Sequence, residues 1–175
     1  MAYLMARRTG RIELAMTIAE RGFDAARRAE RPDLAALMAM NRGGGLMGLG
    51  ARWRAARICA DALREVSALP GPTPKDTRTA EAQGMLLLTV GLVAARDGRP
   101  QDTATYLTQA RDLAARTGER NHMRFHFGPT NVAAWELGLA VEPGTGPDAA
   151  ERFATAPIDF SVFASKERQA DVSAY

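Results

Sequence analysis

The sequence is poor in cysteine, histidine and aromatic residues. It contains one cysteine, Cys59, two histidines, His122 and His126, and only 6% aromatic residues. A lone cysteine cannot form an internal disulfide, and it favours a reducing cytoplasm. Runs of β-branched residues are nearly absent, so β-strands have little support. These scarcities exclude a disulfide scaffold and disfavour a β-fold.

Long apolar runs and an apolar leader are missing as well. The longest apolar run, 85–95, is too short to cross a bilayer. Arg7, Arg8 and Arg11 stand where a signal peptide would have its apolar segment. We therefore expect a cytoplasmic protein with no membrane partner.

Lysine is almost absent, whereas arginine is abundant. Only two of the 23 basic residues are lysines, Lys75 and Lys166, and the formal net charge is +3. This bias is typical of a high-GC genome such as that of an actinobacterium. The arginines are interleaved with acids, as in 27–31, which indicates solvated helix faces. Nucleic-acid binding needs basic residues clustered on one face, so we expect no direct binding of nucleic acid by this chain.

Good helix formers dominate what is present, and glycine and proline divide them into segments. After a stub at 1–9, the spacing of apolar residues predicts helices that end or begin at these breakers. The predicted helices cover 10–30, 32–48, 51–68, 76–96, 101–117 and 130–142, with a short helix to about 156 and a last one from about 160.

The glycines at the corners recur at regular intervals. Gly10, Gly50, Gly98 and Gly144 each separate two predicted helices, and a small residue follows five positions later. This spacing resembles the tetratricopeptide repeat, in which small residues stand where helices cross closely. It predicts an all-α, tetratricopeptide-like right-handed stack of antiparallel helix pairs, with about seven to eight helices in one domain over 1–175. The repeat pattern predicts no capping helix at either end, so we expect a fragment of a longer protein or a homodimer.

No motif in the sequence predicts an enzyme, a metal site or a cofactor. The run Gly43–Gly48 satisfies G-x-G-x-x-G but follows a helical segment rather than a strand, which favours close helix packing over a nucleotide site. His122 and His126 are four residues apart, yet no further ligands complete a metal set. A helical-bundle enzyme that uses the loop with His122 and His126, together with Glu136, is a weaker alternative.

The most distinctive segment is 124–133, which reads RFHFGPTNVA. It resembles the C-terminal tetratricopeptide-repeat-like region of actinobacterial helix-turn-helix transcriptional regulators of the XRE type, and the resemblance extends over about 10–157. It implies the sensor half of such a regulator, with the DNA-binding domain joined before residue 9. The glycine cluster at 43–50 departs from the pattern of that family.

In a tetratricopeptide pair the first helix lines the concave face, which predicts a groove rich in Met and Leu with a few polar anchors. A methionine adapts to varied apolar groups, and the carboxamide of Asn131 suits the backbone of an extended peptide. For the methionines the alternative is packing between helices, and for Asn131 it is a structural hydrogen bond. The predicted ligand-binding residues are Met40, Asn41, Met47, Met85, Leu88, Arg96, Arg124, His126, Phe127, Asn131 and Trp135.

Two functions therefore stay open beside the enzyme alternative. The first is a domain of a cytoplasmic transcriptional regulator that senses a short peptide or a small apolar ligand in the concave groove. The second is a protein–protein interaction scaffold that uses the same groove for a partner protein and has no small ligand.

Overall fold

The computed structural model describes residues 2–71, 73, 76–141, 151, 155 and 159–162. Within these residues there are helices and no named strands, which confirms the all-α prediction. The elements are α1 (Ala2–Arg8), α2 (Ile12–Arg28), α3 (Pro32–Gly48), α4 (Arg52–Ser67), α5 (Arg78–Arg96), α6 (Pro100–Thr117), α7 (Pro129–Val141) and a 3-10 turn η1 (Phe160–Val162). The predicted helix ends from 32 to 142 agree to within about two residues. The helix predicted to end near 156 lies mostly outside the described residues.

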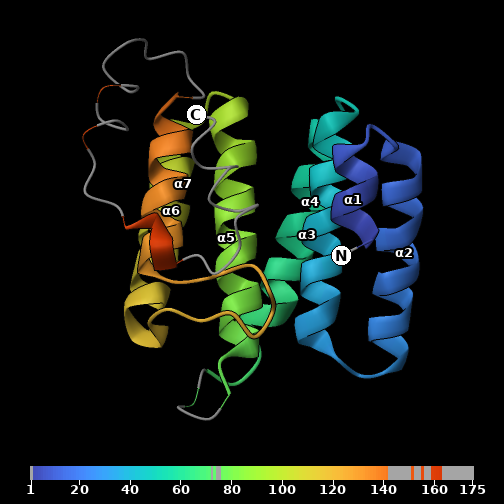
Figure 1. Ribbon diagram of the computed structural model, residues 1–175, viewed down its shortest axis with the longest axis horizontal. Coiled ribbons are helices and arrows are strands. Elements are labelled where there is room, and N and C mark those ends of the chain that lie inside the picture. Colours follow the sequence, from blue (N-terminus) through green and yellow to red (C-terminus); the bar gives the residue numbers. More distant parts are fainter. Residues whose placement is uncertain are drawn as a thin grey trace.

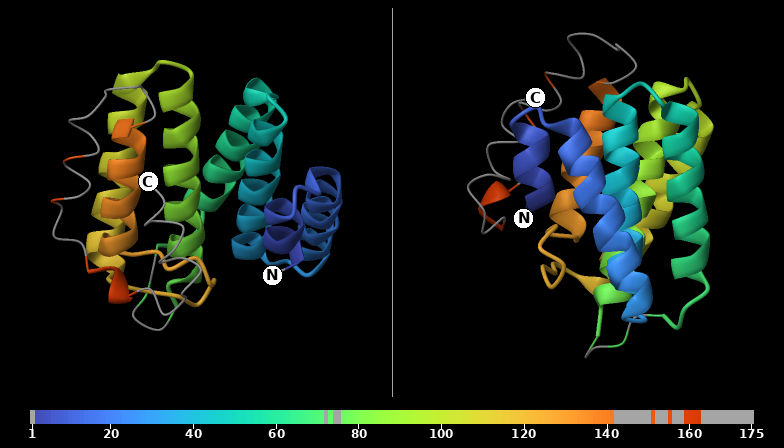
Figure 2. Two further views of the ribbon diagram at one scale, coloured as in Figure 1. Left: turned by 45° about the horizontal axis from the view of Figure 1, so that its top comes forward. Right: turned by 90° about the vertical axis from the view of Figure 1, so that its right-hand side faces the viewer.

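The helices form antiparallel pairs that stand side by side in a row. Figure 1 shows each helix running opposite to the one before it, and Figure 2 shows the pairs following one another across the molecule. We call α1, α3, α5 and α7 the A helices and α2, α4 and α6 the B helices. The helix α3 packs against α2, α4 and α5, while α5 packs against α3, α4, α6 and α7. The core is therefore centred on α3 and α5.

The three corners between an A helix and the following B helix share one geometry. Gly10, Gly50 and Gly98 have φ of 75°, 76° and 68°, a left-handed backbone that glycine adopts without strain. At each corner an N–H past the glycine bonds back to the last turn of the A helix, for example Arg99 N–H to the Ala94 oxygen at 2.9 Å. All three corners lie at the same end of the stack (Figure 1). The corner predicted at Gly144 is outside the described residues.

The glycine cluster lies inside α3 and allows three neighbouring helices to come close. A Cβ on Gly43 would overlap Sγ of Cys59 in α4, and a Cβ on Gly45 would overlap Sδ of Met16 in α2. A Cβ on Gly44 would lie 3.3 Å from the Tyr3 hydroxyl in α1. The G-x-G-x-x-G match is therefore a packing feature of a central helix.

Candidate functional site

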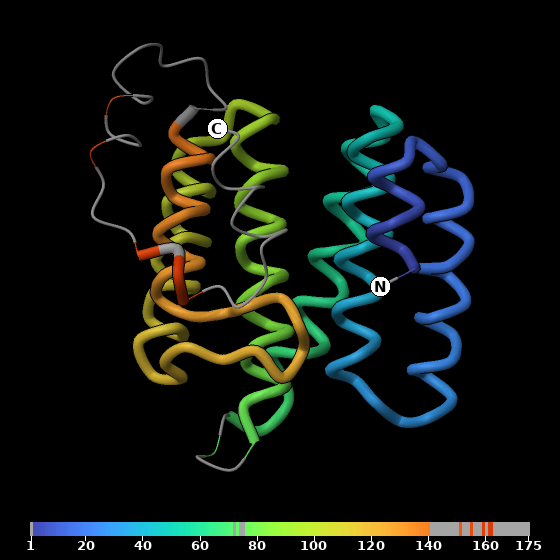
Figure 3. The backbone as a smooth tube through the Cα atoms, viewed as in Figure 1, coloured from blue at the N-terminus to red at the C-terminus, as the bar shows by residue number. Residues whose placement is uncertain are grey.

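The candidate site is the loop between α6 and α7, residues 118–128, which we call the 118–128 loop. It crosses the first turns of α5 on the side of the A helices (Figure 3). Although the loop has no regular structure, its backbone is held at several points. Arg120 N–H donates to the Phe127 oxygen at 2.9 Å, and His126 N–H donates to Oδ1 of Asn121 at 3.1 Å.

The main anchor of the loop is a buried carboxylate on α5. Glu81 is 1% exposed. Its Oε1 lies 2.9 Å from the Thr77 hydroxyl and 2.7 Å from Nδ1 of His122, and its Oε2 accepts the Met123 N–H at 3.2 Å. A buried carboxylate is costly unless polar partners satisfy it, and the two contacts from His122 and Met123 tie the loop to α5.

The Phe-Gly-Pro-Thr segment anchors the loop a second time, through close packing. Phe127 is fully buried and lies against Gly84 of α5, where a Cβ would overlap its ring. Gly128 lies against Glu119 in the same way. Oε1 of Glu119 also accepts the Thr130 N–H at 2.7 Å, which caps the start of α7. The distinctive sequence of this segment is therefore accounted for by packing and capping.

Asn131, predicted as a polar anchor for a ligand, holds the loop instead. It is 0% exposed, and its Nδ2 donates to the Phe125 oxygen at 3.0 Å and lies 3.6 Å from Sδ of Met85. A side chain with no exposed surface cannot contact a ligand in a groove unless the structure opens. The structure thus corresponds to the alternative interpretation, a structural hydrogen bond.

The outer surface of the loop is basic. Every second residue from 120 to 126 is basic, namely Arg120, His122, Arg124 and His126. The side chains of these residues are exposed or half-buried, whereas that of Met123 is buried. Arg124 and His126 have φ of 59° and 52°, a left-handed backbone that costs non-glycine residues about 1 kcal/mol or more each. Arg124 makes no ion pair within the described part of the chain. The backbone of the loop is held, for example by the Arg124 N–H that donates to the Asn121 oxygen at 3.2 Å, while the Arg124 side chain is exposed.

The remaining predicted residues are divided between the core and distant positions. Met40, Asn41, Met85 and Leu88 are at most 8% exposed, so the expected groove along α3 and α5 is largely filled by side chains. The physical reason is that the A helices pack directly on each other and on the B helices, which buries the positions that repeat spacing assigns to a concave face. Of these four residues only Met85 lies beside an anchor of the loop, with its Sδ 3.6 Å from Nδ2 of Asn131.

Met47, Arg96 and Trp135 complete the predicted set. Met47 is half-buried near the end of α3, and Arg96 is exposed at the end of α5, roughly 20 Å along the helix from the 118–128 loop. Trp135 is half-buried on α7, and its Nε1 is buried without a hydrogen-bond partner. The structure therefore brings Met85, Arg124, His126, Phe127 and Asn131 together around the loop and leaves the others apart.

Two residues of the enzyme alternative, His122 and Glu136, have polar partners outside the set predicted for it. Thr77 and Glu81 both approach Nδ1 of His122, whereas a nucleophile–base–acid triad uses the two ring nitrogens separately. Glu136 pairs with Arg111 at 2.5 Å. No group of three or more His, Cys, Asp or Glu side chains suited to hold a metal ion occurs among the residues that the structure describes.

Sequence analysis missed Glu81, the central residue of the anchor. The signal was present, because Glu81 precedes Met85 and Leu88 by one and two helical turns and so falls on their buried face. An acid at a core position of a helix requires partners, and the nearest polar loop supplied them.

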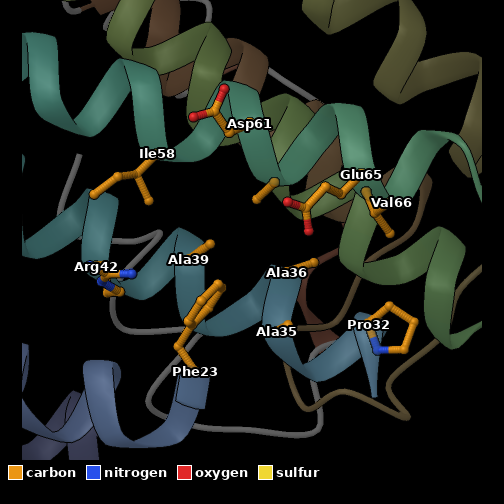
Figure 4. Close-up of a pocket in the computed structure, with 11 residues that line it drawn as sticks. Phe23, Pro32, Ala35, Ala36, Ala39, Arg42, Ile58, Asp61, Glu65 and Val66 are labelled. Atoms are coloured by element: carbon orange, nitrogen blue, oxygen red, sulfur yellow. The ribbon is translucent and has the colours of Figure 1, made fainter. Parts of the chain in front are cut away.

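A shallow groove opens on the B-helix side, between α2 and α4 and above α3 (Figure 4). It has a volume of about 220 Å³ and a floor of alanines, Ala35, Ala36 and Ala39. Asp61 and Glu65 stand on its α4 side, and Arg27 of α2 reaches Glu65 across it at 2.9 Å. We call it the α2–α4 groove.

The fold defines a class of protein, an all-α stack of antiparallel helix pairs. Comparison with known protein families gives no match, and neither the curated proteins nor the solved structures contain a significant one. In the described residues no helix combines the length and apolar character needed to span a membrane.

Proposed function

We propose that this chain is the sensing or interaction domain of a cytoplasmic transcriptional regulator, and that it binds a short peptide or small apolar ligand beside the 118–128 loop. The observation that carries the proposal is the loop itself, in which the exposed Arg124 and the half-buried His126 sit on left-handed backbone above a buried scaffold. Backbone strain of this kind persists only where the surroundings impose it, and it is concentrated at ligand sites.

Arg124 is the residue that we expect to contact the ligand. A guanidinium offers a planar pair of donors that matches a carboxylate, such as the C-terminus of a peptide. The half-buried Phe125 next to it offers an apolar surface for a neighbouring side chain. His126 completes the same edge of the loop.

The loop also offers a way to transmit binding. It is tied to α5 through Glu81 and to α7 through Glu119 and Asn131. A ligand that prefers one arrangement of the loop would shift how α6 and α7 pack on α5, and it can shift that equilibrium only by its differential affinity. The regulator context itself rests on the resemblance of 124–133.

The test is native mass spectrometry of the protein purified from its own host, under mild and then denaturing conditions. We expect a peptide or small molecule that is released only on denaturation. Arg124→Ala should lose this adduct, whereas Arg21→Ala, an exposed arginine in the middle of α2, should keep it.

Two other outcomes would change the proposal. An adduct retained by Arg124→Ala would place the ligand away from the loop. A clean mass in both proteins would favour the interaction scaffold, for which the open α2–α4 groove, spanned by Arg27 and Glu65, offers a surface for a partner's side chains.

A further inference from the structure

A second groove lies on the B-helix side, one repeat further along, between α4 and α6 and above α5. It is lined by Ala56, Arg57, Ala60, Val90, Val93, Arg99 and Tyr106, and has a volume of about 270 Å³. We call it the α4–α6 groove. Like the α2–α4 groove, it lies between two B helices and above an A helix, but it is nearer the glycine corner of its repeat, and its charge differs. Asp61 and Glu65 line the first, whereas the charged residues that line the second are arginines.

An exposed tryptophan stands at one end of the α4–α6 groove. Trp53 lies one helical turn before Ala56 and Arg57, on the same stripe of α4, and is 62% exposed. The guanidinium carbons of Arg54 and Arg57 lie 5.2 and 5.3 Å from its ring centroid. An exposed aromatic side chain with two cations beside its ring resembles the anchor residues found at the centre of protein interfaces.

The arginines of this surface destabilise the N-terminus of α4. Arg52, Arg54 and Arg57 occupy the first two turns of α4, which has no acid in its first turn. Positive charge opposes the dipole at a helix N-terminus, and like charges three residues apart repel each other. Arg54 and Arg57 make no ion pair within the described ranges. Arg99 does, with Asp97 and Asp102, so a further carboxylate would compete there.

We propose that the α4–α6 groove and Trp53 form a docking surface for an acidic amphipathic segment of a partner protein. Apolar side chains of that segment would cover the floor of Ala56, Ala60, Val90 and Val93, and its carboxylates would meet Arg54 and Arg57. A nucleic-acid backbone fits less well, because phosphates would leave the apolar floor uncovered. This surface is separate from the 118–128 loop, which lies at the other end of α5 (Figure 1).

The chain contains two tryptophans, so Trp135→Phe leaves Trp53 as the only tryptophan reporter. Because Nε1 of Trp135 has no hydrogen-bond partner, this change removes no bond. The probe is a synthetic amphipathic peptide of about 14 residues with leucines on one helical face and Glu or Asp on the other, about four helical turns. We expect a saturable change in Trp53 fluorescence, with a Kd between about 1 and 10 micromolar.

The variants separate charge from shape. Arg57→Glu should weaken binding by about tenfold or more, because it reverses a charge at the contact. Ala60→Phe, which fills the groove without changing charge, should weaken it by a similar factor. Arg21→Glu, the same charge change on α2, should alter the Kd by less than about twofold. Arg124→Ala should leave peptide binding unchanged, which separates this surface from the proposed ligand site. Circular dichroism of each variant checks the fold.

The proposal is overturned if Arg57→Glu and Ala60→Phe, both folded, bind the peptide as tightly as the parent protein. It is also overturned if a scrambled peptide, an oligouridylate or phosphatidylserine vesicles change the Trp53 fluorescence with equal affinity. The last two results would identify a general polyanion or lipid surface. No response to any probe would show that the groove is not a docking site.

Discussion

Glycines at buried positions make some of the closest contacts in this molecule. Gly84 receives the ring of Phe127, and Gly43 and Gly45 receive side chains of the two flanking helices. Glycine in a helix costs about 1 kcal/mol relative to alanine, so these positions exchange helix propensity for close packing. Other glycines, such as Gly138, have open space around them and gain nothing of the kind.

This difference gives a matched pair of substitutions. Gly84→Ala should destabilise the protein by about 1–3 kcal/mol, because the new Cβ overlaps the rigid ring of Phe127. Gly138→Ala, also in a helix but with nothing within 4 Å of its Cβ position, should stabilise it by about 0.5–1 kcal/mol. Urea denaturation followed by circular dichroism measures both. Equal effects of the two changes would contradict the placement of Phe127.

The single thiol should be unreactive in the folded protein. Cys59 is fully buried, and burial raises the pKa of its thiol to about 12. At pH 8 the reactive thiolate is then roughly a thousandfold scarcer than at an ordinary cysteine. Labelling with a disulfide reagent should be slow in buffer and fast in urea. Fast labelling without denaturant would show that α3 and α4 separate readily around Gly43.

At the scale of elements, the 118–128 loop is held by contacts with two helices, α5 and α7. The Glu81 carboxylate, the Phe127 ring and the Asn131 carboxamide each fix a different part of it. An exposed loop of this length is ordinarily mobile, since its backbone bonds to water. Here its mobility depends on whether a few buried side chains stay in place.

Removal of the carboxylate should therefore free the loop before it unfolds the domain. Glu81→Ala takes away the acceptor of the Met123 N–H and the partner of His122. Hydrogen exchange measured by mass spectrometry should speed up over 119–128 by about tenfold or more, as for the loss of a bond worth at least about 1.4 kcal/mol. Glu136→Ala breaks only an exposed pair with Arg111 and should leave that exchange nearly unchanged. Similar exchange in both variants would argue against an anchor at Glu81.

At the scale of the whole molecule, stability should follow position in the row of helices. In a stack each pair is held mainly by its neighbours, so the ends have fewer contacts than the centre. The helix α1 has only seven residues and packs chiefly on α2, whereas α5 packs on four helices. The Tyr3 hydroxyl donates a hydrogen bond to the Asn41 oxygen at 2.5 Å and so joins α1 to α3.

The protection of backbone amides against hydrogen exchange should therefore rise from α1 to α5. Amides of α1 should exchange at rates set by local fraying, and those in the middle of α5 at rates set by global unfolding. Tyr3→Phe should accelerate exchange in α1 and α2 and leave α5 unchanged. Uniform protection along the chain would indicate that another surface, such as a second copy of the chain, covers α1.

The sequence by itself determined the helices and their corners, because those signals are local. Apolar spacing, Pro32 and Pro100 at helix starts, and Gly10, Gly50 and Gly98 at left-handed turns all act within a few residues. It also pointed to 124–133 as the distinctive segment and placed Arg124 and His126 among the predicted ligand-binding residues. The ligand contacts assigned to them are still predictions.

Only the tertiary structure decided which of the predicted residues face outward. Leu88, Phe127 and Asn131 looked like groove residues, yet all three are fully buried, because the A helices pack on one another too closely to leave a groove there. Glu81 and His122 meet across 41 positions of sequence. Contacts of that range depend on how helices pack, and helical period alone carries no information about them.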